Sequence, residues 1–118
     1  MSAHTLGHLK HEVIKAYNAV NQDMFVAGVS QQRAEIWGDK ILIVAEHRRI
    51  PALAVLDAAE PIIAHLTDMV LIGESKRRLG RTLESVVGQK VVAVLKDYDP
   101  ESTLAATVVV FDKPLDLA

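Results

Sequence analysis

The chain has 118 residues, of which half are hydrophobic and 24% are charged, and it contains no cysteine. This length is typical of one domain with its own core, since single domains cluster near about 100–150 residues. The absence of cysteine excludes disulfides, a thiolate nucleophile and thiolate metal sites, and the formal charge of −2 does not favour nucleic acid as a partner.

The first part of the chain has the periodicity of an amphipathic helix. Apolar side chains recur there at steps of three and four residues, in a stripe made of Leu6, Leu9, Val13, Tyr17, Val20 and Met24. We therefore predict a helix from about Thr5 to about Asp23, followed by a break at Gly28.

Two strands joined by a tight turn are expected next. Polar and apolar residues mix from Val29 to Trp37, which favours an edge strand, and Gly38-Asp39 is typical of a two-residue hairpin turn. Residues 40–46 are apolar on both faces, which indicates a strand covered on both sides. Pro51 lies shortly beyond this strand, whose hydrogen-bond ladder a proline cannot continue.

A long helical region should run from Pro51 to Val87. Pro61 is expected to interrupt it near Glu60, and Gly88 occupies the position of a C-terminal cap. In its middle, apolar side chains cover nearly every side of the helix, namely Ile62, Ile63, Leu66, Met69, Val70, Leu71 and Ile72. Because a helix that is apolar all round is buried all round, we predict a homodimer in which a second copy covers it. Packing beneath the N-terminal helix of the same chain is the alternative.

Residues 90–96 and 104–111 are predicted to form two further strands, and the acidic loop between them, which contains Pro100, should turn the chain. The order of elements is then helix, hairpin, long broken helix, hairpin. This order predicts a single α+β domain over residues 1–118, with helices on one face of a mainly antiparallel sheet.

No stretch of the sequence is typical of export or membrane insertion. Residues 1–10 carry polar and histidine side chains where a signal peptide has an apolar core. The most apolar stretch, residues 61–72, is interrupted by His65, Thr67 and Asp68, and it is shorter than the ~20 apolar residues of a membrane span. We therefore expect a cytoplasmic protein without direct membrane insertion.

Two groups of basic residues are the candidates for a binding surface. They are Lys76, Arg77, Arg78 and Arg81 in one group, and Arg48 and Arg49, next to His47, in the other. If the two groups meet in space, they make a patch for phosphate, a nucleotide or an acidic protein. An ordinary solvated helix surface is the alternative interpretation.

Other chemistry has little support in the sequence. His4, His8 and Glu12 are spaced so that one side of a helix carries them, which suits zinc or nickel, although a solvated helix face has the same pattern. No serine lies in a Gly-x-Ser-x-Gly setting, and no glycine-rich phosphate loop occurs. We therefore expect no catalytic residues, no resident metal and no cofactor.

Three stretches carry a resemblance to a known family: Trp37–Val44, Leu83–Val91, and Ala93 through the acidic loop to Phe111. Together they resemble the MpsC-like family of small bacterial domains, named after a component of a sodium-translocating, membrane-potential-generating system. The resemblance implies an α+β fold and an accessory role at a membrane ion or inorganic-carbon transport system. Residues 26–31, 50–54 and 65–69 depart from the family pattern, so no functional residue is carried over.

The sequence as a whole predicts a non-catalytic, cytoplasmic interaction module with an accessory or regulatory role, acting as a homodimer. Its partner would be a protein at a membrane transport complex, as the resemblance implies, and the basic residues would contact it. The alternative is a sensor domain that binds a small ligand, either a phosphate-bearing molecule or a metal ion.

Overall fold

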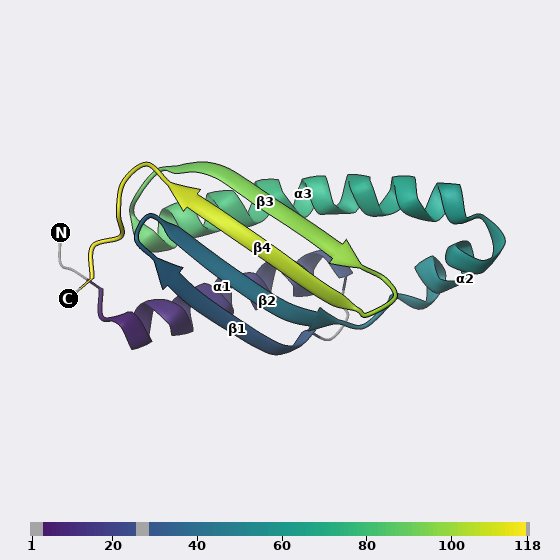
Figure 1. Cartoon of the computed structure of the whole chain (residues 1–118), viewed down its shortest axis with the longest axis horizontal. Helices are drawn as coiled ribbons and strands as arrows, with labels where there is room; N and C mark the ends of the chain where they lie inside the picture. Colours follow the sequence, from purple (N-terminus) through teal and green to yellow (C-terminus); the bar gives the residue numbers. More distant parts are fainter. Residues whose placement is uncertain (1–3, 26–28, 118) are drawn as a thin grey trace.

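The computed structural model describes residues 4–25 and 29–117 and contains three helices and four strands in the predicted order. They are α1 (Leu6–Phe25), β1 (Val29–Trp37), β2 (Lys40–His47), α2 (Pro51–Ala59), α3 (Pro61–Val87), β3 (Val91–Asp99) and β4 (Leu104–Phe111). The α+β fold class is confirmed (Figure 1).

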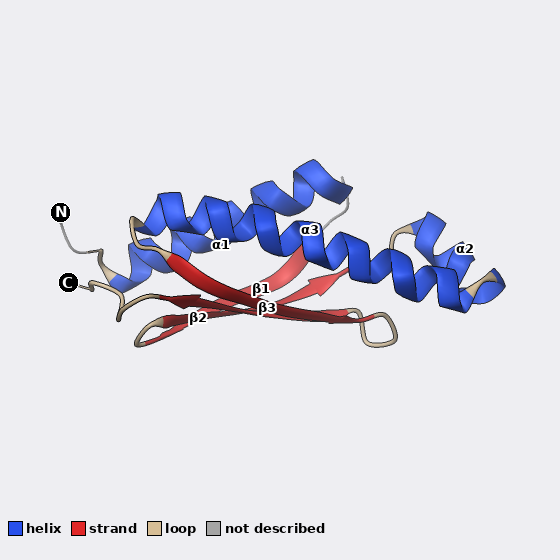
Figure 2. Cartoon of the chain, turned by 90° about the horizontal axis from the view of Figure 1, so that it is seen from above, coloured by secondary structure: helices blue, strands red, loops and turns tan. Residues whose placement is uncertain are grey.

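The four strands form one antiparallel sheet in the order β1-β2-β4-β3, so that the two hairpins lie side by side. The first hairpin turns at Gly38, whose φ of 59° is readily adopted only by glycine. Helices α1 and α3 cover one face of this sheet (Figure 2). The fully buried core therefore lies between these helices and the sheet, and it includes Leu9, Val13, Tyr17, Ile41, Ile43, Leu79, Leu83, Val109 and Phe111.

Proline and glycine residues set the boundaries of α2 and α3. Pro51 and Pro61 stand at the first turns of α2 and α3, where a missing N–H costs nothing. Glu60 between them has a non-helical φ of −144°, which separates the two helices at the predicted position. Gly88 ends α3 in the left-handed conformation, as expected of a C-terminal cap. The predicted break at Gly28 lies outside the described residues.

Strand β3 is longer than predicted, and it ends at Asp99 rather than Lys96. Residues 97–99 pair with residues 104–106 of β4, because the chain reverses only after Asp99. The acidic loop is correspondingly shorter than the sequence suggested. Thr103, with a φ of 61°, completes this turn before β4 begins.

Helix α2 and the N-terminal part of α3 extend beyond the end of the sheet and form a helical arm (Figures 1 and 2). The arm explains the elongated shape of the chain, which measures 51 × 24 × 21 Å. In the single chain this part of α3 is not covered on all sides, so the alternative of packing beneath the N-terminal helix is wrong for its exposed side chains, and cover by a second copy stays a prediction. The exposed apolar side chains of this part of α3, with Val55 of α2, are Ile62, Ile63, Leu66, Met69 and Val70.

Candidate functional site

A small pocket lies where the arm meets the end of the sheet, with a cavity of about 60 Å³. Hydrocarbon side chains, including Leu53, Leu71 and Ile72, form much of its wall. Its polar lining comes from separate segments: His47 from β2, Arg48 and Arg49 from the segment that follows it, Asp68 and Ser75 from α3, and Lys96 and Tyr98 from β3. We refer to it as the Lys96 pocket.

Lys96 is the central cation of the pocket. Its Nζ donates a hydrogen bond to Oγ of buried Ser75 at 3.0 Å and lies 5.2 Å from the ring centroid of Tyr17. No carboxylate of the described chain forms an ion pair with it. Burial lowers the pKa of Lys96 to about 8, so the ammonium is still mostly charged at pH 7. The fold therefore holds a largely buried positive charge without an opposite charge.

His47 lies next to this charge and is held neutral. Burial, with a contribution from the charge of Lys96, lowers the pKa of His47 to about 4. Its Nε2 is hydrogen-bonded to the hydroxyl of Tyr17. Burial raises the pKa of Tyr17 above its usual value, so the phenol stays protonated and donates to Nε2. The ring proton of His47 is therefore assigned to Nδ1.

The depressed pKa of His47 predicts a loss of stability in acid. Below pH 6.5 the imidazole of His47 becomes protonated in the unfolded chain. In the folded chain it stays neutral until the pH falls to about 4, so the unfolded chain binds more protons between these two values. Acidification from pH 6.5 to pH 4.5 should therefore remove about 2 kcal/mol of unfolding free energy through this residue. His47→Gln, whose Oε1 can still accept from Tyr17, should lack this part of the pH dependence. Urea unfolding of both proteins across this range tests the prediction, and parallel curves would contradict it.

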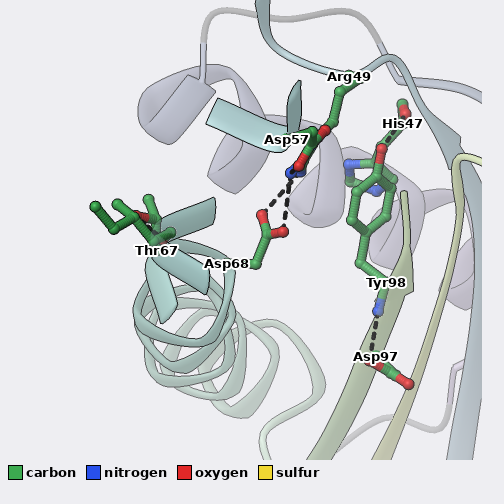
Figure 3. A network of polar contacts seen from close by, with 8 residues as sticks. His47, Arg49, Asp57, Thr67, Asp68, Asp97 and Tyr98 are labelled. Atoms are coloured by element: carbon green, nitrogen blue, oxygen red, sulfur yellow. Dashed lines mark hydrogen bonds and ion pairs between the residues drawn. The ribbon is translucent and has the colours of Figure 1, made fainter. Parts of the chain in front are cut away.

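Arg49 is fully occupied by two carboxylates (Figure 3). Its guanidinium binds Asp57 of α2 through Nε and Nη2, at 2.9 and 2.7 Å. It binds Asp68 of α3 through Nη1 and Nη2, at 2.8 and 2.9 Å. The side chain also lies 5.7 Å from the ring centroid of Tyr98. Arg49 therefore joins both helices of the arm to the segment that follows β2.

The structure separates the two predicted basic groups. Arg48 and Arg49 line the Lys96 pocket, and Arg49 reaches α3 at Asp68, eight residues before Lys76, which is about 12 Å along a helix axis. In the other group, Arg77 and Arg78 both pair with Glu74, while Arg78 and Arg81 border a shallow depression beside α1. We call Lys76, Arg77, Arg78 and Arg81 the α3 basic cluster.

The N-terminal histidines are not gathered into a metal site. His4 precedes α1, and its Nε2 lies 3.2 Å from the carbonyl oxygen of Val87. Within residues 4–25 and 29–117, no three His, Cys, Asp or Glu side chains are placed to hold a metal ion.

The face of the sheet opposite the helices is uncovered in the single chain and largely apolar. The strand register aligns its residues in cross-strand rows, with Leu42 of β2, Val108 of β4 and Leu95 of β3 in the central one. The exposed fraction is 37% for Val44 and 60% for Leu95. We call this surface the open sheet face; its apolar residues are Trp37, Leu42, Val44, Ala93, Leu95, Leu104, Ala106, Val108 and Val110.

Charged residues lie at both ends of the open sheet face and along its β1 edge. Lys40 stands at the end near the first hairpin turn, and Glu46 and Asp97 stand toward the arm. On the β1 edge, Glu35 pairs with Leu42 and Arg33 with Val44. The prediction that residues 40–46 are covered on both sides is therefore wrong for the single chain, because both packing helices lie on the other face.

No family model, curated protein or solved structure matches this chain, so the MpsC-like resemblance is still an expectation from the sequence. Within the described residues, no helix has the length and hydrophobicity required to cross a membrane.

Proposed function

We propose that this chain is a non-catalytic accessory module that works as a homodimer in the cytoplasm, with two open sheet faces packed against each other. The observation that carries the proposal is the apolar open sheet face. In an antiparallel sheet with one face in water, apolar residues that face the core normally alternate with polar residues that face the water. Here Leu42, Val44 and Val108 occupy the two central strands instead, and exposed apolar patches of this kind mark interaction sites.

A second copy of the chain is the occupant that the charges favour. A two-fold axis perpendicular to the strands brings the Lys40 end of one sheet toward the partner's Glu46 and the partner's Asp97. The same operation repeats the contact in reverse, as in any isologous interface. Aligned packing of two sheets, about 10 Å apart, is a common arrangement for such faces.

The size of the face is that of a small interface between two copies. Four strands at about 4.8 Å spacing, each with about seven residues at 3.3 Å, make a face of roughly 19 by 23 Å. Two such faces cover on the order of 900 Å² before the relief of the side chains is added, which is below the ~1,200–2,000 Å² of standard interfaces and within the range of weak ones. The cysteine-free composition supports the reducing cytoplasm as the compartment.

Sheet-to-sheet packing leaves the α3 basic cluster on the outside of the dimer. The cluster has four cations, whereas Glu74 pairs with Arg77 and Arg78, and Asp23 of α1 borders the same depression as Arg78 and Arg81. The remaining excess of positive charge favours an acidic surface on a partner protein. We propose this cluster as the contact through which the dimer acts on that partner.

The dimer is tested by native mass spectrometry and light scattering on the wild type and two matched lysine variants. Val44→Lys places a charge within the open sheet face, whereas Val70→Lys places one on the arm, where Val70 is 69% exposed. We expect a wild-type dimer at micromolar concentration and at least ~100-fold weaker association for Val44→Lys, because burying an unpaired ammonium is costly. Val70→Lys should remain dimeric.

Two results would overturn this arrangement. A wild-type protein that stays monomeric at about 50 μM would exclude a specific dimer of the proposed kind. A dimer that survives Val44→Lys but dissociates with Val70→Lys would place the interface on the arm, where the sequence first suggested it. Circular dichroism of both variants shows whether the fold is kept.

A further inference from the structure

We infer that the Lys96 pocket binds a small organic anion, a monocarboxylate with a short hydrocarbon chain, whose carboxylate contacts Lys96. This site is distinct from the open sheet face and from the α3 basic cluster, and it does not depend on the dimer. The inference rests on the charges around the pocket, its hydrogen-bond donors, and its size and wall.

Among the described lining residues, Lys96 is the cation that is largely buried and has no carboxylate in contact with it. Arg49 is paired with two carboxylates, so Arg49, Asp57 and Asp68 together carry a charge of −1, and Arg48 is exposed to solvent. The ammonium of Lys96 contacts a serine hydroxyl and an aromatic ring, and the neutral ring of His47 lies nearby. Because a buried charge is costly unless it is paired, an anion in direct contact with Nζ is the partner that this arrangement lacks.

The donors in the pocket suit a carboxylate group. An ammonium has three N–H donors, and the hydrogen bond to Ser75 uses one of them. The Ser75 hydroxyl accepts that bond, so its own proton can be donated to a second oxygen. Hydrogen bonds between an ammonium and a carboxylate are among the stronger ones in proteins.

The size and wall of the pocket select the rest of the ligand. A cavity of about 60 Å³ has room for only a few heavy atoms, since one water needs about 10–15 Å³ on this measure. Leu53, Leu71 and Ile72 give the pocket a hydrocarbon wall, against which a chain of two to four carbons fits. A phosphate dianion would bring a second charge, for which the described residues in the buried part of the pocket offer no free cation, because Arg49 is occupied by Asp68 and Arg48 is exposed to solvent.

The test is a comparison of thermal shifts and titration calorimetry with named probes. Butyrate, at about 20 mM, should raise the melting temperature of the wild type, since a ligand that binds only the folded state stabilises it. Butyramide, which has the same shape without the charge, should not, and inorganic phosphate should not. Chemical-shift changes confined to residues around the pocket would locate the site.

Variants connect the effect to Lys96. Lys96→Met should weaken butyrate binding by at least ~30-fold, and Ser75→Ala by about 5-fold, because charged hydrogen bonds contribute more than neutral ones. Lys15→Met, which removes an exposed lysine from α1, should bind like the wild type. Dissociation constants that are the same for Lys96→Met and the wild type would overturn the inference.

Three further outcomes also count against it. The absence of any shift with acetate, propionate and butyrate would exclude the site. A shift with phosphate as large as that with butyrate would exclude the carboxylate class. Covalent trapping of an aldehyde on Lys96 by borohydride, without binding of butyrate, would assign the lysine to imine formation with a carbonyl compound instead.

Discussion

Replacing Arg49 with methionine should lower the free energy of unfolding by about 3 kcal/mol, the lower end of the range of roughly 3–5 kcal/mol expected when one partner of a buried ion pair is removed. The side chains of Arg49 and Asp68 are only 12% and 15% exposed. The variant loses the guanidinium that binds both helices of the arm and leaves the carboxylate of Asp68 in a site with little access to water. Urea unfolding at pH 7 measures the change, which corresponds to a drop of roughly 10 °C in melting temperature.

Two further variants show whether the loss of stability in Arg49→Met comes from its buried ion pairs or from the removal of any arginine. Arg77→Met removes an exposed guanidinium from the Glu74 pair, and exposed pairs of this kind contribute little. Asp68→Asn added to Arg49→Met removes the stranded carboxylate and should restore part of the lost stability. If Arg77→Met cost as much as Arg49→Met, the arm would not depend on the Arg49 ion pairs.

The same substitution should loosen the arm more than the sheet. Arg49 contacts α2 through Asp57 and α3 through Asp68, and outside these ion pairs the arm presents many apolar side chains to water. Hydrogen exchange should therefore increase first in α2 and the first turns of α3, because local opening follows local contact density. Equal acceleration in β2 and β4 would indicate global unfolding instead.

The order of the elements and the boundaries of α2 and α3 could be predicted because single residues decide them. Pro51 and Pro61 begin helices, Gly88 ends one, and Gly38-Asp39 forms a hairpin turn. These effects are local, so one sequence is enough to see them. The exposure of the arm was not predictable in the same way, because it depends on where the sheet ends beneath α3.

The Lys96 pocket was missed because its residues come from distant segments and because a β-bulge hides the inward position of Lys96. The register shifts between Val91 and Ala93. Val91 pairs with Phe111, on the face toward the helices, so uninterrupted alternation would also turn Leu95 toward the helices and Lys96 away. The extra residue, Val92, reverses the alternation. Leu95 then faces water, and the side chain of Lys96 lies on the face of the sheet that packs against the helices.

The same bulge thus contributes to both proposed surfaces. It places Leu95 on the open sheet face, in the row of Leu42 and Val108, and it places Lys96 beneath α3, next to Ser75. A leucine in water and a lysine among hydrocarbon side chains each reduce the stability of the isolated chain. Natural proteins depart from the local rules of folding mainly at functional sites, and here two neighbouring residues do so together.

Replacing Lys96 with methionine should stabilise the protein, in contrast to most substitutions at buried positions. A pKa of about 8, against the usual 10.5, means that the folded chain holds this ammonium at a cost of about 3 kcal/mol. Methionine keeps the length of the side chain without the charge. Loss of the Ser75 hydrogen bond offsets about 1 kcal/mol, so the net gain at pH 7 should be about 2 kcal/mol.

The pH dependence of this gain identifies its cause. Between pH 8 and pH 10.5 the unfolded chain binds more protons at Lys96 than the folded chain, so the stability of the wild type rises through this interval. The other groups around Lys96 keep their charge from pH 7 to pH 9.5: His47 and Tyr17 stay neutral, and Arg49 stays paired with Asp68. Lys96→Met should therefore exceed the wild type in stability at pH 7 and approach it at pH 9.5. A constant difference across this range would mean that packing, and not the buried charge, separates the two proteins; a loss of stability at pH 7 would mean that Lys96 already has a compensating partner in the folded chain.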